Sequence, residues 1–345
     1  MGTVLYLGTR NGVLTVAEDG GGWSIASHDL KGWEVTEVAP APDDPRRVLA
    51  GTRGDGVWRS EDAGAHWSKP SYGRVAPGKV RCVTVDPHDP QTIYAGCEPI
   101  SMWKSVDGGA SWTEIESVRN FPSVAGIGYP VPIVEPHVRD ITIAPDDPST
   151  MYAALQVGYM LKTTDGGETW RLLDNGLDED VHAIITDPRD TSHIYISSGG
   201  EGMRAGKASG RSLYRSLDGG ENWLPIAMEF QNEYSVAFAY DPADPSVMYS
   251  AVANGNPGQW RNRDSGAEAN LIRSRDAGQT WHELSASEEV ARGFPEAIAV
   301  DPESPGRVFL ATRSGCLFMS DDSGDSWTDL GVKTPEVANM KIAHV

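Results

Sequence analysis

Apolar residues in this chain occur in short runs of strand length, and polar turns rich in Asp, Gly and Pro separate the runs. The runs recur with a period of about 45 residues and four runs per unit, which is the pattern of a β-propeller blade. A hairpin signature of Ser or Thr, Asp, Gly and Trp marks each unit. Its seven copies, the first of them degenerate, end at Trp23, Trp67, Trp112, Trp170, Trp223, Trp281 and Trp327. We therefore predict an all-β fold over residues 1–345, a single seven-bladed β-propeller of four-stranded antiparallel blades.

A second tag supports the same period. In the full units a Pro precedes an apolar or aromatic residue by seven positions, as in Pro87 and Tyr94. Proline interrupts a strand, so this tag marks the connection between the first and second strands. The N-terminal unit lacks the tag because the chain begins at a second strand. We predict that residues 339–345 supply the missing strand and that this C-terminal strand joins the N-terminal blade, which removes two sheet edges.

Composition narrows the possible partners. The formal net charge of −20 disfavours nucleic acid. The three cysteines have neither metal-binding nor disulfide-like spacing, and the eight histidines are scattered, so we expect no metal and no cofactor. The N-terminus lacks the pattern of a secretory signal, and no apolar run has the length of a membrane span. We expect a cytoplasmic monomer without a membrane partner, and a protein partner remains an open alternative.

Three segments lengthen the repeat, and all are predicted to emerge on the same face. They lie near residues 116–137, 199–211 and 254–270. Function on a rigid scaffold usually resides in such loops. The alternative is neutral variation of surface loops. We therefore expect a ligand to bind on this face.

The hairpin signature resembles the Asp-box, or bacterial neuraminidase repeat, as in Ser274-Arg-Asp276-Ala-Gly278-Gln-Thr-Trp281. That repeat occurs in sialidases, xyloglucan-degrading glycosidases, sortilin-type receptors and a photosystem assembly factor. There the box is a structural hairpin, which implies that the box aspartates of this chain belong to turns and not to a catalytic site. A sialidase mechanism is disfavoured, because the Arg-Ile-Pro motif with the first catalytic arginine is absent and that propeller has one blade fewer.

Three blades place an arginine at the fourth position after the second-strand aromatic or apolar residue, namely Arg10, Arg53 and Arg313. These blades are neighbours in a closed propeller. Guanidinium groups bind carboxylate, sulfate or phosphate with paired donors. We predict a basic patch that binds an anionic small molecule or glycan. The alternative is that each arginine pairs with a local acid.

The inner strands of a propeller line its central channel, and strand alternation allows only one of two columns to face it. The first column contains Thr36, Arg81, Arg139, His182 and Glu296, and the second contains Glu37, Cys82 and Asp140. We predict that Arg81 or Arg139 binds an anionic group and that Glu296 and His182 act as acid and base. A hydrolase needs two carboxylates, for which Glu296 with Asp140 or Glu37 is the predicted pair.

Three further residues are predicted near the channel mouth: His137, Tyr234 and Trp260. Trp260 could stack on a sugar or staple its own loop. The leading hypothesis is an enzyme, a hydrolase or lyase that acts on an anionic small molecule or acidic glycan at the channel mouth. The second hypothesis is a non-catalytic propeller that binds a protein or ligand as an assembly module, with the polar channel serving no catalysis.

Overall fold

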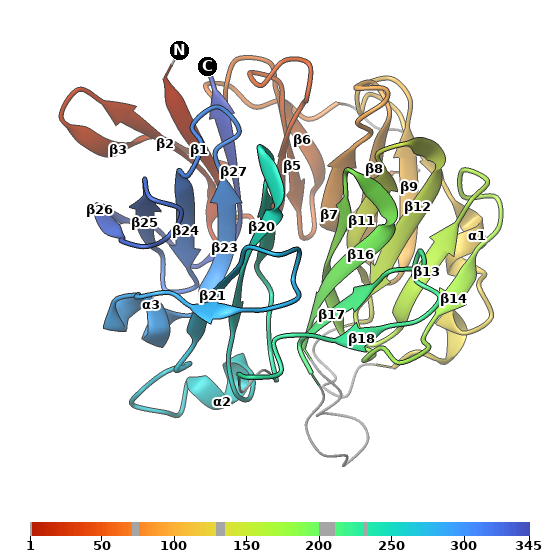
Figure 1. Cartoon of the computed structure of the whole chain (residues 1–345). Helices are drawn as coiled ribbons and strands as arrows, with labels where there is room; N and C mark the ends of the chain where they lie inside the picture. Colours follow the sequence, from red (N-terminus) through yellow and green to blue (C-terminus); the bar gives the residue numbers. More distant parts are fainter. Residues whose placement is uncertain (1, 71–75, 129–134, 200–210, 231–232) are drawn as a thin grey trace. The chain divides into compact units, whose positions relative to one another are not determined.

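The computed structural model describes residues 2–70, 76–128, 135–199, 211–230 and 233–345, and its fold is the predicted seven-bladed β-propeller (Figure 1). Two compact units make up the chain. Unit 1 comprises Met1–Asp174 with Ala338–Val345, and unit 2 comprises Asn175–Val337. Unit 1 contains four blades and unit 2 contains three. The expectation of one domain over residues 1–345 stays a prediction.

The blades of unit 1 have the strand orders β27-β1-β2-β3, β4-β5-β6, β10-β9-β8-β7 and β11-β12-β13-β14. Their strands are β1 (Thr3–Thr9), β2 (Gly12–Asp19), β3 (Gly22–Asp29), β4 (Val35–Pro40), β5 (Val48–Thr52), β6 (Gly56–Ser60), β7 (Lys79–Val85), β8 (Ile93–Glu98), β9 (Ser101–Ser105), β10 (Thr113–Glu114), β11 (Val138–Ala144), β12 (Asp147–Leu155), β13 (Tyr159–Thr163), β14 (Arg171–Leu173) and β27 (Val337–His344).

The blades of unit 2 have the orders β15-β16-β17-β18, β19-β20-β21-β22 and β23-β24-β25-β26. Their strands are β15 (Val181–Asp187), β16 (Asp190–Ser198), β17 (Leu213–Ser216), β18 (Leu224–Pro225), β19 (Phe238–Asp241), β20 (Asp244–Val252), β21 (Asn270–Ser274), β22 (His282–Glu283), β23 (Pro295–Val300), β24 (Val308–Thr312), β25 (Cys316–Ser320) and β26 (Thr328–Lys333).

Short helices occur between strands. They are α1 (Glu116–Arg119), the 3-10 helix η1 (Val124–Gly126), α2 (Pro257–Trp260) and α3 (Glu288–Gly293). The insertion 116–137 therefore contains α1 and η1, and the insertion 254–270 contains α2. Most of the insertion 199–211 lies outside the described residues. That all three share one face stays a prediction.

The predicted closure by the C-terminal strand is confirmed. Strand β27 lies beside β1, and the two chain ends lie next to each other in Figure 1. The N–H of Gly2 donates to the carbonyl oxygen of Val345 at 2.8 Å, and the side-chain oxygen of Asn339 accepts from the N–H of Val38 at 3.2 Å. Without β27, the buried strand β1 would present unpaired backbone groups along its edge.

One blade departs from the predicted four strands. Among the described residues, the blade of β4, β5 and β6 has three, and its fourth-strand position is reduced to a single bridge between Arg59 and Ser68. Pro70 follows two residues later. Because proline has no backbone N–H to donate, it stops the pairing there.

The six full signature hairpins share the hydrogen bonds of their Ser or Thr and Asp side chains, and in some of them the indole of the Trp donates as well. In the third blade, the hydroxyl of Ser105 donates to Asp107 at 2.7 Å and accepts from the N–H of Gly109 at 2.9 Å. Asp107 also accepts from the N–H of Ser111, and the indole of Trp112 donates to the carbonyl of Gly109. The box carboxylates are thus engaged by their own turns, as the resemblance implied.

A β-bulge recurs in the first strands of five blades, where the register shifts between the residues on either side of one extra residue. The extra residues are Thr36, Arg81, Arg139, His182 and Glu296, which form the first predicted column. A bulge interrupts strand alternation and redirects side chains. The expectation that only one column can face a ligand therefore fails, because alternation does not continue across these positions.

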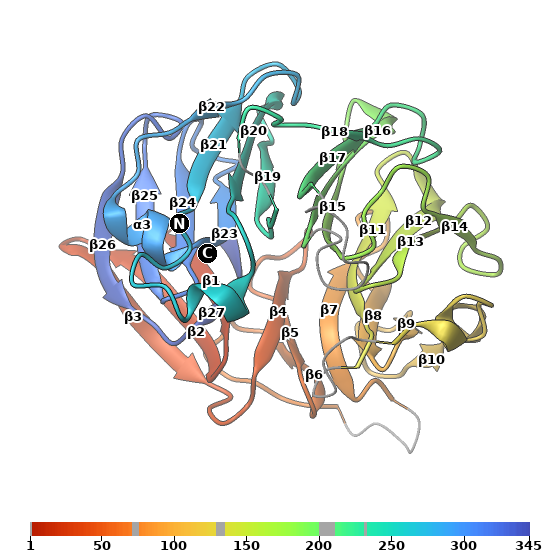
Figure 2. The same ribbon diagram turned by 90° about the horizontal axis from the view of Figure 1, so that it is seen from below.

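Neighbouring blades of unit 1 pack closely through glycines of their second strands. A Cβ on Gly51 would lie 2.8 Å from Val80, and one on Gly96 would lie 2.7 Å from Val138. Only glycine permits this approach, which brings the first strands β4, β7 and β11 side by side (Figure 2).

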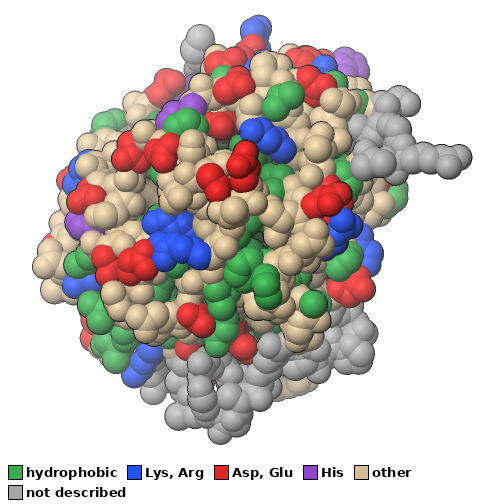
Figure 3. All heavy atoms as spheres, turned by 90° about the vertical axis from the view of Figure 1, so that its right-hand side faces the viewer, with side chains coloured by type: hydrophobic (Ala, Val, Ile, Leu, Met, Phe, Trp, Pro, Cys, Tyr) green, Lys and Arg blue, Asp and Glu red, His purple; other side chains and the backbone are tan. Residues whose placement is uncertain are grey.

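The surface and the helices add two observations. Acidic, basic and apolar side chains are interspersed on the face drawn in Figure 3, although the formal net charge is −20. Among the described residues, each helix falls short of the length and apolarity needed to cross a membrane.

Candidate functional site

The candidate site lies on the adjacent first strands of unit 1. We define the first-strand row as the bulge residue and its successor on each strand: Thr36 and Glu37 on β4, Arg81 and Cys82 on β7, and Arg139 and Asp140 on β11. His137 directly precedes β11, and Lys341 lies on β27. The row therefore combines two carboxyl groups with basic side chains on strands that touch one another.

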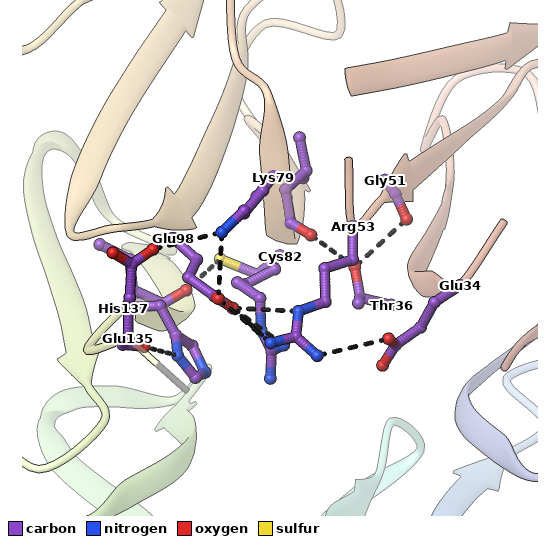
Figure 4. Close-up of polar contacts among 12 residues, drawn as sticks. Glu34, Thr36, Gly51, Arg53, Lys79, Cys82, Glu98, Glu135 and His137 are labelled. Carbon is purple, nitrogen blue, oxygen red and sulfur yellow. Dashed lines mark hydrogen bonds and ion pairs between the residues drawn. The ribbon is translucent and has the colours of Figure 1, made fainter. Parts of the chain in front are cut away.

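Arg53 and Glu98 form a bidentate ion pair beside the first-strand row (Figure 4). Arg53 follows β5 and Glu98 ends β8, so they come from neighbouring blades. Nε and Nη2 of Arg53 donate to the two carboxylate oxygens at 3.0 and 3.1 Å. The third nitrogen reaches Glu34 at 3.5 Å. With a side chain that is only 2% exposed, Glu98 is a buried acid that this fork neutralises.

Glu98 also attracts two other cations. Nη1 of Arg81 lies 3.4 Å from its carboxylate, and Nζ of Lys79 lies 3.7 Å away. Burial, together with the positive charges of Arg139 and Arg53, lowers the pKa of Arg81 to about 10. Several cations therefore share one buried carboxylate.

Arg139 and His137 have polar groups that lack a hydrogen-bond partner among the described residues. Within the part of the chain that the structure describes, Arg139 has no hydrogen bond or ion pair. His137 is fully buried, and its Nδ1 lies 3.0 Å from the backbone oxygen of Glu135. Its Nε2 has no hydrogen-bond partner among the described residues. Burial and the charges of Arg81 and Arg139 hold the pKa of His137 well below its ordinary value.

Glu37 is the carboxyl group with the most unusual titration in the row. Burial, and to a smaller extent the nearby Asp140, raise the pKa of Glu37 to about 7 against the opposing charges of Lys341 and Arg139. Nζ of Lys341 lies 3.6 Å from the carboxyl group. A carboxyl group with such a pKa carries a proton for part of the time at neutral pH, so it can act as a general acid.

Two arginines of the predicted basic patch are not available to an anion. In unit 2, Nε and Nη2 of Arg313 grip the two oxygens of Glu296 at 2.8 and 3.0 Å, and Arg53 is held by Glu98. Arg10 approaches Glu34 at 3.9 Å. The alternative of pairing with nearby acids thus describes these residues, and the expectation of a free three-arginine patch is corrected.

Glu296 and His182 are poorly placed as the predicted acid and base. The carboxylate of Glu296 is occupied on both oxygens by Arg313. His182 is buried, with Nδ1 2.7 Å from the carbonyl oxygen of Ser235 and Nε2 3.5 Å from Asp180. Both side chains serve internal pairs of unit 2.

The predicted aromatic ligand-binding residues form a packed cluster in unit 2. Trp260 stacks on Phe294 with ring centroids 4.7 Å apart, and Tyr234 meets Trp260 edge-on at 5.1 Å. The Trp260 indole donates to the carbonyl oxygen of Asn254 at 2.8 Å. Trp260 is only 6% exposed, so it staples its loop, which was the alternative to stacking on a sugar.

The structure brings together five of the predicted residues: His137, Arg53, Arg81, Arg139 and Asp140. Sequence reasoning left out Glu98 and Lys341, and it named Glu37 only as an alternative to Asp140 in a carboxylate pair with Glu296. One signal for Glu98 was present, because it occupies in its blade the position that Arg53 occupies in the preceding one. Among the described residues, no group of three or more His, Cys, Asp and Glu side chains is arranged to hold a metal ion.

Comparisons with known proteins find xyloglucanases and YCF48 among the similar proteins. A xyloglucanase from Paenibacillus sp. is 25% identical over 200 residues, which are 52% of this chain and 19% of that protein. An ancestral GH74 enzyme has a similar structure, with a TM-score of 0.64 and 18% identity over 90% of this chain and 38% of the other. YCF48 bound to D1 peptide has a TM-score of 0.57 and 17% identity, over 88% of this chain and 84% of the other.

These likenesses place the chain among β-propellers. No family model matches it. The chain spans less than a quarter of the length of the curated xyloglucanases that it matches. The activity of those longer proteins is therefore not carried over, and a function must rest on the first-strand row.

Proposed function

We propose that this propeller hydrolyses a glycan that carries a negative charge and that the reaction takes place at the first-strand row. The observation that supports the proposal most directly is the juxtaposition of Glu37 and Asp140 beside Arg139. The relatives include xyloglucanases, whose name states a glycan substrate. Glycoside hydrolysis requires two carboxyl groups with different protonation states, and the row supplies two.

Glu37 has the role of general acid. Burial keeps its proton at a pH where an exposed carboxyl group has lost it. The proton passes to the glycosidic oxygen as the bond between that oxygen and the anomeric carbon breaks. Nearby Lys341 stabilises the resulting carboxylate, since its ammonium group lies 3.6 Å away. The acid therefore returns to a stable charged form after it has given up its proton.

Asp140 has the role of base. It takes a proton from a water molecule as the water oxygen bonds to the anomeric carbon, so that one water is consumed for each bond cleaved. Its Oδ1 accepts the N–H of Ile141 at 2.8 Å, which orients the carboxylate on its strand. Arg139, next to it in the chain, attracts the charged group of the glycan.

The test is cleavage of neutral and uronic-acid-containing oligosaccharides, followed by chromatography of the products. Wild type should cleave a charged oligosaccharide, while Glu37→Gln and Asp140→Asn should each lose activity by about 100-fold or more. Glu61→Gln is the matched control, because that exposed carboxylate pairs with Arg59 outside the row. Cleavage by Glu37→Gln at the wild-type rate would remove Glu37 from the mechanism, and inactivity of wild type on every oligosaccharide would refute hydrolysis.

A second candidate is ligand or protein binding without catalysis. One observation favours it: Arg53 and Arg81 already share Glu98, which gives the row a rigid ionic framework of the kind that a binding surface needs. A propeller of similar fold, YCF48, has been solved bound to D1 peptide. Saturable binding of an oligosaccharide or peptide with no cleavage would support this candidate over hydrolysis.

A further inference from the structure

The protonation of His137 follows from its surroundings. Its Nδ1 lies 3.0 Å from the backbone oxygen of Glu135, and a carbonyl oxygen only accepts hydrogen bonds. Nδ1 therefore carries the hydrogen. Because nearby cations and burial keep the ring neutral, Nε2 has no hydrogen and presents a lone pair.

This lone pair is a buried acceptor without a donor among the described residues. Such a group is costly to bury unless a hydrogen bond satisfies it. The guanidinium groups of Arg81 and Arg139 can donate hydrogen bonds, and their charges act on the His137 ring. Arg139 is partly exposed, whereas His137 is fully buried. A ligand therefore meets Arg139 first and extends a small donor to the imidazole.

The cations around the ring favour an anion. Arg53, Arg81 and Lys79 all approach the carboxylate of Glu98, and Arg139 has no acid of its own within the described residues. The mutual repulsion of Arg81 and Arg139 is relieved when an anion binds between or beside them. His137 directly precedes β11 and Arg139 lies on it, next to β7 with Arg81, and the charges of both arginines act on the imidazole ring.

We infer that Arg139, Arg81 and His137 form a subsite for a hydroxy-carboxylate, in which Arg139 and Arg81 bind the carboxylate and a neighbouring hydroxyl group donates to Nε2 of His137. A hexuronic acid unit has this arrangement, since its carboxylate and ring hydroxyls are adjacent. The inference rests on the proposed function for the glycan class and adds the chemical group that the site selects. A sulfate ester or a simple carboxylate lacks the hydroxyl donor at the required place.

The subsite is tested by binding alone, with D-glucuronate, D-glucose, cyclohexanecarboxylate and inorganic sulfate as probes. Wild type should bind glucuronate at least about tenfold more tightly than the other three, by titration calorimetry or ligand-observed NMR. Arg139→Gln should remove most of this preference, and Arg139→Lys should restore part of it. Equal affinity for all four probes, or sulfate as tight as glucuronate, would overturn the inference.

His137 is tested by a measurement that a purely structural role would not change. In protein with ¹⁵N-labelled histidine, Nε2 of His137 should have the chemical shift of an unprotonated nitrogen, and the shift should move on adding glucuronate but not cyclohexanecarboxylate. His137→Phe should bind both carboxylates equally. An unmoved shift on saturation with glucuronate would contradict the hydrogen bond, even where the variant does not fold.

The proposed hydrolysis and the proposed subsite can be refuted independently of each other. Glu37→Gln should lose cleavage yet keep the preference for glucuronate over the other three probes, because Arg139, Arg81 and His137 remain in place. Selective glucuronate binding without cleavage of any oligosaccharide would sustain the subsite and refute hydrolysis. Cleavage without selectivity for glucuronate would support hydrolysis and refute the subsite.

Discussion

Arg53 and Glu98 connect two neighbouring blades of unit 1 through two parallel hydrogen bonds, at 3.0 and 3.1 Å. The Glu98 side chain is almost fully buried, while a quarter of the Arg53 side chain is exposed. Planar donors matched to both oxygens make such a fork stronger than a single contact. The pair fixes the edge of the first-strand row, because Arg81 reaches the same carboxylate.

We predict that Arg53→Met lowers the free energy of unfolding by about 3 kcal/mol, the lower end for breaking a buried pair, because Arg81 and Lys79 still partly neutralise Glu98. Urea denaturation measures the change. The control is Arg119→Met, whose half-exposed ion pair with Glu114 should contribute within about 0.5 kcal/mol.

The double variant Arg53→Met/Glu98→Met should recover part of the loss, because it removes the buried carboxylate that lost its fork, but not all of it, because Arg81 then loses its carboxylate partner. Wild-type stability of Arg53→Met would show that the fork does not hold the blades together.

The raised pKa of Glu37 predicts a pH dependence of stability. In the unfolded chain this carboxyl group loses its proton near its ordinary pKa of 4.5, and in the folded chain it keeps the proton until about pH 7. The folded state therefore binds more protons between these values, so the free energy of unfolding falls as pH rises through this window.

Glu37→Gln removes that dependence. Relative to wild type, the variant should gain about 2–3 kcal/mol of stability between pH 4.5 and pH 8, which thermal or urea denaturation at both pH values can measure. Glu61→Gln should show no such relative gain, because that side chain is more than half exposed. A pH-independent difference between Glu37→Gln and wild type would show that Glu37 titrates normally.

The closing strand predicts the effect of a truncation. Deleting residues 335–345 removes β27 and leaves β1 as an unpaired edge. We expect a fall in Tm of more than about 10 °C and concentration-dependent aggregation, measured by calorimetry and light scattering. Lys341→Gln keeps the strand and should melt close to wild type. A truncated protein that stays monomeric with an unchanged Tm would refute this role for β27.

Local signals in the sequence were enough to predict the number of blades. The box turns depend on groups within a few residues of one another, as in the hydrogen bonds of Ser105, Asp107 and Gly109. Such bonds form wherever the pattern occurs, so counting the pattern counts the blades. The same count left the N-terminal blade one strand short, and the only unassigned run was at the C-terminus. The place of β27 was therefore predictable before any coordinates.

The ion pairs and protonation states of the first-strand row were not predictable from such local signals. The partner of Arg53 lies 45 residues away, on another blade, whereas the sequence suggested only a local acid as the alternative to a ligand. The pKa of Glu37 depends on burial and on Asp140 and Lys341, which come from distant parts of the chain. The expected alternation of side chains along the first strands also did not indicate the β-bulges.

The sequence by itself determined the fold class, the number of blades and the structural role of the box aspartates, because these follow from short-range hydrogen bonding and from apolar periodicity. The tertiary structure decided which arginines are neutralised, which carboxyl group keeps its proton and which acceptor lacks a donor. Those properties depend on desolvation and on distances of a few ångströms between blades, and both are set only when bulges and close-packed glycines bring β4, β7 and β11 together.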